Sequence, residues 1–385
     1  MYKYLAKRIL QMAITLLLFQ AATYFLIDAQ PGDITDKWLA NPDIPPYVRD
    51  QIRAELGLDR PPAERFVTYI GNFYRGNLGL SFSYYPRPVI DVVMERLPRT
   101  IVLFLSATLV SFWAGFLTGK VLAWRRGGWV EYAATISGVT LYTVFTPWFA
   151  LMMIWLFAVQ LDWLPAGKFL DPVKWLDASV DANYVFTRMF NTGMILLLMI
   201  LVGLIYSNRL RGQVRAAFRA AILLVPMMGA FAYWQSSGVA HLAVDIASHL
   251  ILPVLTLTLI SYAGMMLLTR TSMLETLRED YIQTARAKGL PAKVVRDKHA
   301  ARNALLPVWT SLVFSLANTV GGGIITESVF SWPGIGQSLL NSALQSDIPL
   351  AMATLTILGV LTLVGHLVVD IGYVYLDPRI RYRGE

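Results

Sequence analysis

The sequence contains no cysteine among its 385 residues, and only 15% of its residues are charged. The absence of cysteine excludes disulfide bonds, thiolate metal sites and cysteine catalysis. The patterns G-x-x-x-x-G-K-[ST], H-E-x-x-H and G-x-S-x-G, which signal phosphate-binding loops, zinc peptidases and serine hydrolases, are also missing. We therefore expect no catalytic residue, no metal site and no bound cofactor in this chain.

Hydrophobic residues make up 56% of the sequence, and its mean hydropathy is +0.51. Such values lie outside the range of ordinary soluble domains and place the chain in a lipid bilayer. The net charge of +8 could suggest a nucleic-acid partner. The basic residues, however, stand in short blocks beside apolar runs, which is how membrane topology is encoded. We expect no nucleic-acid partner.

Eight apolar stretches are long enough to cross a bilayer, which requires about 20 residues as a helix. The sequence therefore predicts an all-α, polytopic membrane helix bundle. The candidate spans cover residues 9–27, 101–123, 134–160, 190–207, 220–235, 250–269, 308–325 and 349–376.

The positions of the basic residues provide a test of the predicted orientation of these spans. If the N-terminus is cytoplasmic, basic clusters fall in every predicted inner segment, and the last two outer loops contain neither Lys nor Arg. Eight spans then place both termini in the cytoplasm. We expect the first span to be an uncleaved anchor, since no small-x-small cleavage site follows it closely.

A long outer segment separates the first two spans and has a different composition, rich in Pro, Asp and Arg. Its amphipathic pattern predicts three short helices, over residues 47–56, 63–73 and 89–97.

A polar loop, residues 270–307, interrupts the apolar second half of the chain and carries eight Lys and Arg. Leu274, Leu277, Tyr281 and Ala285 recur at helical spacing, and the sequence predicts one helix from residue 274 to residue 288. Gly289 and Pro291 then end that helix and permit another. The pattern is typical of a short docking element.

Several motifs recur in an order that resembles a known family. They are GNLGLSFS from Gly76, TARAKGL from Thr284, HAARNALLP from His299, WPGIGQ from Trp332 and DPRIR from Asp377. This combination resembles the permease subunits of ABC importers, in the dipeptide, oligopeptide and nickel branch. In that family the polar loop is the cytoplasmic coupling loop, which receives the motion of an ATPase.

The resemblance implies a six-helix permease core with an additional inserted hairpin. The implied parts are an N-terminal transmembrane anchor (1–27), an extracytoplasmic segment (28–100), the first part of the core (101–169), an inserted two-span hairpin (170–244) and the rest of the core with its coupling loop (245–385). The hairpin is either a peripheral addition or a docking surface for an accessory subunit.

The resemblance also implies partners. This subunit would pair with a second, different permease chain, with two ATP-binding subunits that hold ATP and Mg, and with an extracytoplasmic binding protein. It would import peptides or similar oligomeric solutes across the cytoplasmic (inner) membrane of a prokaryote and would not itself be an enzyme. The alternative is an ion-coupled secondary transporter, in which His366 and Asp370, four residues apart in the last span, would carry the ion.

Three sets of candidate site residues follow from the resemblance. The coupling set is Thr284, Ala285, Arg286, Ala287, Lys288, Gly289, Leu290, Pro291, His299, Arg302 and Asn303. The pore or gate set is Gly321, Gly322, Gly323 and Glu327. The extracytoplasmic motif set is Trp332, Pro333, Gly334, Gly336 and Asp347.

Some of these residues leave alternatives open. Three adjacent glycines inside a span either break the helix toward a pore or permit a tight helix contact. Glu327 is either an aqueous-surface residue or a gate contact. His241, Asp245 and His249 recur every four residues, and a capping or interfacial role competes there with a metal site.

Overall fold

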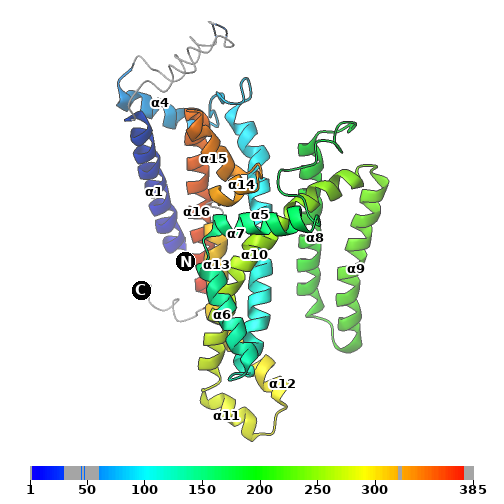
Figure 1. Ribbon diagram of the computed structural model, residues 1–385. Coiled ribbons are helices and arrows are strands. Elements are labelled where there is room, and N and C mark those ends of the chain that lie inside the picture. Colours follow the sequence, from blue (N-terminus) through cyan, green and yellow to red (C-terminus); the bar gives the residue numbers. More distant parts are fainter. Residues whose placement is uncertain (1, 30–44, 46, 48–59, 320–322, 377–385) are drawn as a thin grey trace. The chain divides into compact units, whose positions relative to one another are not determined.

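The computed structural model of the chain (Figure 1) describes residues 2–29, 45, 47, 60–319 and 323–376. These residues form helices joined by turns, and there is no β-strand among them. The helices are, in chain order, α1 (Tyr2–Asp28), α4 (Pro62–Tyr74), α5 (Val89–Trp124), α6 (Trp129–Thr143), α7 (Thr146–Ile154), the π-helix η1 (Trp155–Gln160), α8 (Ala182–Ser207), α9 (Gly212–Ser236), α10 (Ala240–Thr276), α11 (Asp280–Ala287), α12 (Ala292–Val294), the π-helix η2 (Val295–Ala300), α13 (Ala301–Thr319), α14 (Ile324–Val329), α15 (Ile335–Leu344) and α16 (Ile348–Leu376).

Six of the described helices are long and apolar enough to span a membrane, and a bent pair of shorter helices gives a seventh candidate. The six are α1, α5, α8, α9, α10 and α16, and each contains one of the spans predicted from the sequence. The fold class is therefore confirmed as an all-α, polytopic membrane protein.

The predicted span 134–160 is wrong as a single straight helix. The chain turns through 106° between α6 and the run from Thr146 to Gln160. Pro147 lies at the start of α7 and explains the break, because its ring would clash with the carbonyl of Thr143 in a continuous helix. The predicted span 308–325 corresponds to α13 and α14, and residues 320–322 between them lie outside the described residues.

The chain divides into two compact units, of which unit 1 comprises residues 1–152 and 254–385. Helix α5 belongs to both apolar cores of this unit. Its first turns, with Val89 and Val93, pack with Ile335 of α15 and Leu350 of α16. Its later turns pack with the polar loop and α13. One helix therefore contacts both regions that carry the sequence motifs.

Gly115 and Gly119 let α5 approach α10 closely, as the small-xxx-small pattern predicts. A Cβ added at Gly115 would lie 2.6 Å from the Cβ of Met265, and one at Gly119 would lie 2.7 Å from the Cβ of Thr269. Larger side chains at either glycine would force the two helices apart.

The outer segment is partly as predicted. The predicted helix 63–73 is confirmed as α4, whereas 47–56 lies almost entirely outside the described residues. The predicted third short helix, 89–97, is wrong as a separate element, because it forms the first turns of α5 and the helix continues through Pro98. The contacts of Arg99 and Thr100 described below hold the chain in place beyond this proline.

Helix α1 lies beside α16 (Figure 1), and an ion pair joins them. The Nε atom of Arg8 lies 2.5 Å from Oδ2 of Asp370. Asp370 is therefore neutralised by a neighbouring helix. This pairing leaves little reason to assign the carboxylate to a transported ion.

Unit 2, residues 153–253, contains the predicted hairpin, and α8 and α9 run side by side within it (Figure 1). Gly203 of α8 faces Ile222 of α9 so closely that a Cβ there would collide with the isoleucine side chain. Near one end, the guanidinium of Arg188 lies 4.4 Å from the ring centre of Tyr233 and donates a 2.6 Å hydrogen bond to its hydroxyl. The hairpin is held together by its own contacts.

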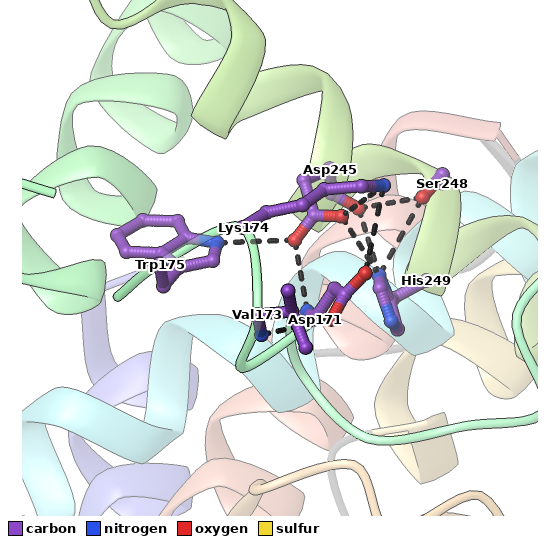
Figure 2. A network of polar contacts seen from close by, with 7 residues as sticks. All are labelled: Asp171, Val173, Lys174, Trp175, Asp245, Ser248 and His249. Atoms are coloured by element: carbon purple, nitrogen blue, oxygen red, sulfur yellow. Dashed lines mark hydrogen bonds and ion pairs between the residues drawn. The ribbon is translucent and has the colours of Figure 1, made fainter. Parts of the chain in front are cut away.

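Asp245 of α10 holds in place the segment that precedes α8, residues 171–175, as Figure 2 shows. Its carboxylate is buried and accepts hydrogen bonds from the backbone N–H of Asp171 (3.0 Å), the ammonium of Lys174 (3.1 Å) and the indole N–H of Trp175 (3.0 Å). The Nδ1 atom of His249 lies 2.9 Å from the backbone carbonyl oxygen of Asp245. These contacts give Asp245 a structural role, and the described residues contain no cluster of three or more possible metal ligands.

Replacing Asp245 with alanine removes an acceptor shared by three donors. We expect the free energy of unfolding to fall by about 1.5–3 kcal/mol, the range for a hydrogen bond to a charged group. Thermal unfolding of the purified full chain in detergent measures this. Asp177→Ala, at an exposed carboxylate in the same segment, is the matched control and should not move the midpoint. Equal midpoints for both variants would mean that Asp245 does not hold the segment.

Candidate functional site

The polar loop 270–307 forms a compact element and not a single helix. Helix α10 ends at Thr276, a turn follows, and α11 begins at Asp280. The prediction of one continuous helix over 274–288 is therefore wrong. After the turn, Ile282 and Ala285 pack into the same apolar core as Leu274 and Leu277.

Gly289 ends α11 as predicted, with a positive φ of +73°. The N–H of Leu290 donates to the carbonyl of Ala285, and the N–H of Gly289 donates to that of Arg286. This pair of bonds is a Schellman cap, which requires the left-handed conformation that glycine adopts most easily. The cap fixes where the exposed end of α11 stops.

The coupling set is almost entirely on the surface of the loop. His299 is half-buried, and Ala285 is buried in the loop's own core. Ala285 is therefore not part of the exposed surface of the loop, because α11 packs on η2 and shares an apolar core with α13. The exposed members are Thr284, Arg286, Ala287, Lys288, Gly289, Leu290, Pro291, Arg302 and Asn303.

Charged contacts tie this loop to the end of α5. The ammonium of Lys120 lies 3.2 Å from Oδ1 of Asp297 in η2, and the guanidinium of Arg296 donates to both oxygens of the same carboxylate. The Arg296 and Lys120 hydrogen bonds lower the pKa of Asp297 to about 2, although its burial opposes them. Arg286 lies over the ring of Trp124 at 5.7 Å. These contacts join the polar loop to the last turns of α5.

The second candidate region lies at the other end of α5. We name it the outer cluster after the sequence prediction that its segments are extracytoplasmic. It comprises Thr100 of α5, Glu327 of α14, the turn Trp332–Gly336 and Asp347. Glu327 is fully buried. Its carboxylate accepts hydrogen bonds from the hydroxyl of Thr100 (2.7 Å) and the backbone N–H of Gln337 (2.8 Å). Burial raises the pKa of Glu327, and these hydrogen bonds oppose that rise.

Two further hydrogen bonds, made by Trp332 and Thr100, connect α5 to the turn Trp332–Gly336. The indole N–H of Trp332, itself fully buried, donates to the backbone carbonyl of Arg99 at 3.2 Å. The N–H of Ile335 donates to the Thr100 hydroxyl oxygen at 2.8 Å. Two segments more than 200 residues apart in the sequence are thereby fixed to each other.

Asp347 connects the GNLGLSFS motif to the start of α16 in a similar way. Its buried carboxylate accepts from the hydroxyl of Ser81 (2.5 Å) and the N–H of Ser83 (2.9 Å), and it caps α16 through the N–H of Leu350 (3.2 Å). The motifs that are separate in the sequence, around Gly76, Thr100, Glu327 and Trp332, therefore meet in one place.

The pore or gate set is divided by the structure. Gly321 and Gly322 lie outside the described residues. Gly323 precedes α14, and a Cβ there would lie 2.5 Å from the ring of Phe104, which indicates a tight contact at this one position. Glu327 is not at an aqueous surface but inside the outer cluster. Gly334 and Gly336 are buried against it, and Pro333 is half-buried.

Sequence reasoning missed the partners of the isolated charges. It singled out Asp245 and Asp370 but assigned neither of them the partners that the structure shows, and it did not pair Lys120 with Asp297. The available signal was their position: a charged group in an apolar helix requires a counter-charge. Glu131 of α6 and Arg270 of α10 form another such buried pair at the loop end of unit 1.

Comparison with known proteins gives the family. Residues 111–382 match the family described as "Binding-protein-dependent transport system inner membrane component", and residues 1–104 match the N-terminal region of membrane components of the same transport systems. The chain belongs to this family. The longer match runs through the predicted hairpin, so it does not separate residues 170–244 from the rest of the family domain.

Several curated relatives match over all or nearly all of their length. The oligopeptide transport system permease protein AppB of Bacillus subtilis is 29% identical over 382 residues, covering 99% of this chain and 100% of that protein. The di/tripeptide transport system permease protein DppB of Pseudomonas aeruginosa is 31% identical over 384 residues, covering 100% of both chains. The dipeptide transport system permease protein DppB of Escherichia coli is 30% identical over 361 residues, covering 94% and 93%.

The family membership has direct consequences for function. The protein is a multi-pass inner-membrane permease component of a binding-protein-dependent ABC importer. It works with partner components and is a transport subunit, not an enzyme. The alternative of an ion-coupled carrier receives no support from any of these relatives.

The close fit of Gly334 against Glu327 leads to a prediction. A Cβ at Gly334 would collide with the carboxylate, whereas one at Gly71 in α4 meets nothing within 4 Å. We expect Gly334→Ala to lower both the thermal stability and the transport activity of the assembled importer. Gly71→Ala, the matched control, should be neutral or stabilise α4 by up to about 1 kcal/mol. If Gly334→Ala behaved like Gly71→Ala, the outer cluster would not need its close packing.

Proposed function

We propose that this chain is one of two different permease subunits of a peptide importer, and that its polar loop is the docking element for an ATP-binding partner. The observation that carries the proposal is the exposed surface of α11 and its glycine cap, held on a rigid core that is tied to α5. The full-length similarity to permeases named for oligopeptides, dipeptides and tripeptides supports peptides as the substrate class.

The partners follow from the chemistry that this chain lacks. The sequence has no phosphate-binding loop, so ATP and Mg would be held by two separate ATP-binding subunits. A binding protein would deliver the peptide at the outer face, where the outer cluster lies. The chain itself would hold no cofactor.

The mechanism couples the two ends of α5. When ATP closes the ATPase pair, the loop moves with its partner, and the Lys120–Asp297 pair carries that motion to α5. At its other end α5 is fixed to the turn Trp332–Gly336 through Thr100. ATP binding thus favours one of two arrangements of the bundle, which opens alternately to either side.

The charge distribution supports an orientation in which both termini and the polar loop are cytoplasmic. In this orientation the α8–α9 turn also faces the cytoplasm, and the segment 161–181 faces outward.

The loop provides a paired test, because Ala285 and Ala287 are two residues apart but differ in exposure. Ala287→Trp should leave the thermal stability of the chain unchanged, since the new ring points away from the core. It should weaken ATPase association and abolish transport by obstructing the docking surface. Co-purification of the ATPase and peptide uptake in proteoliposomes measure both effects.

Ala285→Trp is the matched comparison and should instead lower the thermal stability, because overpacking a core costs typically about 1–3 kcal/mol. Lys288→Ala should be mild, since an exposed ion pair contributes about 0–1 kcal/mol. Wild-type ATPase association and uptake in Ala287→Trp would contradict the docking role of α11.

The orientation is tested by cysteine labelling, for which the absence of native cysteine provides a clean background. Ser179→Cys and Gln213→Cys introduce thiols at exposed positions on the two sides of α8. A membrane-impermeant reagent added to whole cells should label position 179 and not position 213. Labelling at position 213 would reject the eight-span arrangement.

A further inference from the structure

The turn between α8 and α9 concentrates positive charge, and none of its arginines forms an ion pair within the part of the chain that the structure describes. Arg209, Arg211, Arg215 and Arg219 all lie in or beside this turn. No Asp or Glu occurs between residues 182 and 244. Membrane topology requires only that Lys or Arg lie on the inner side and does not require them to converge. The convergence of Arg215 and Arg219 on one neutral side chain favours an anionic ligand.

Hydrogen bonds bring two of these guanidinium groups together. Both Arg215 and Arg219 donate from Nη2 to the side-chain oxygen of Asn208, at 2.6 and 3.2 Å. Arg219 also donates from Nε to the hydroxyl of Ser207 at 2.9 Å. These acceptors are neutral, so the two positive charges lie side by side without compensation. The Nε atom of Arg215 is buried and has no acceptor.

The start of α9 adds to the positive potential. The helix begins at Gly212, its N-cap Arg211 provides no side-chain hydrogen bond, and nothing lies within 4 Å of the Cβ position of Gly212. The first backbone N–H groups of a 25-residue helix are therefore available at the same turn. Unsatisfied N–H groups and the helix dipole favour an anion, and guanidinium groups match the geometry of phosphate.

The apolar surface on either side of the turn distinguishes a phospholipid from other anionic ligands. Ile205 of α8 and Val214 of α9 are 71% and 63% exposed, and only 6% of the most apolar window of each helix is buried inside the protein. Lipid chains cover such surfaces in a membrane, so a phospholipid is the kind of anion that contacts both the arginines and the apolar faces beside them. We propose that the α8–α9 turn binds an anionic phospholipid, with the headgroup phosphate at the arginines and the acyl chains along the hairpin.

Native mass spectrometry of the full chain, purified in detergent, tests this proposal with phosphatidylglycerol and phosphatidylcholine as probes. The wild-type chain should retain phosphatidylglycerol in preference to phosphatidylcholine. Arg215→Gln with Arg219→Gln should weaken phosphatidylglycerol binding about 30-fold, since each arginine near an anionic lipid contributes about 1 kcal/mol and 1.4 kcal/mol corresponds to tenfold.

Two further variants make the result specific. Arg125→Gln with Arg126→Gln removes the same charge from another predicted inner turn and should leave the lipid preference unchanged. Arg215→Lys with Arg219→Lys keeps the charge and should retain most of the preference, which shows that the glutamine variant has not failed through misfolding.

Three results would overturn the proposal: equal retention of both lipids by the wild type, equal losses in the two glutamine variants, or displacement of phosphatidylglycerol by inorganic phosphate. The last would identify a site for a small anion.

Discussion

The buried hydrogen bond between Thr100 and Glu327 is the interaction on which the rest of unit 1 depends. A carboxylate removed from water is stable only when donors surround it, and here the donors come from α5 and from the first turn of α15. Asp347 repeats the arrangement with Ser81 and Ser83. Two carboxylates therefore determine how segments far apart in the sequence come together at this end of α5.

Helix α5 relates the contacts of the outer cluster to transport, because it extends from this cluster to the polar loop. Its 36 residues extend about 54 Å at 1.5 Å per residue, enough to cross a bilayer and protrude from it. Thr100 near its start contacts the outer cluster, and Lys120 near its end pairs with Asp297 of the polar loop. The same rigid helix thus connects the region proposed to receive the ATPase with the region proposed to receive the binding protein. This connection provides the physical basis for the proposed coupling.

The local signals in the sequence predicted the structure best. Apolar runs located six spans, and Gly289 was found as a helix cap because its chemistry is local. Features set by tertiary contacts were missed. The inward direction of Ala285 depends on η2 and α13, and the burial of Glu327 depends on Thr100, 227 residues away. The 106° bend had a local signal in Pro147, but the apolar pattern on both sides concealed it.

In the proposed mechanism, ATP hydrolysis by a partner, and not an ion gradient, drives this permease. The direct test is uptake of labelled peptide by proteoliposomes that contain the complete importer, with its binding protein outside. Uptake should require ATP on the side of the polar loop, should persist when ionophores dissipate the proton and sodium gradients, and should fall to background in Ala287→Trp. Uptake by this chain without an ATPase, driven by an imposed ion gradient and abolished by ionophores, would contradict the claim.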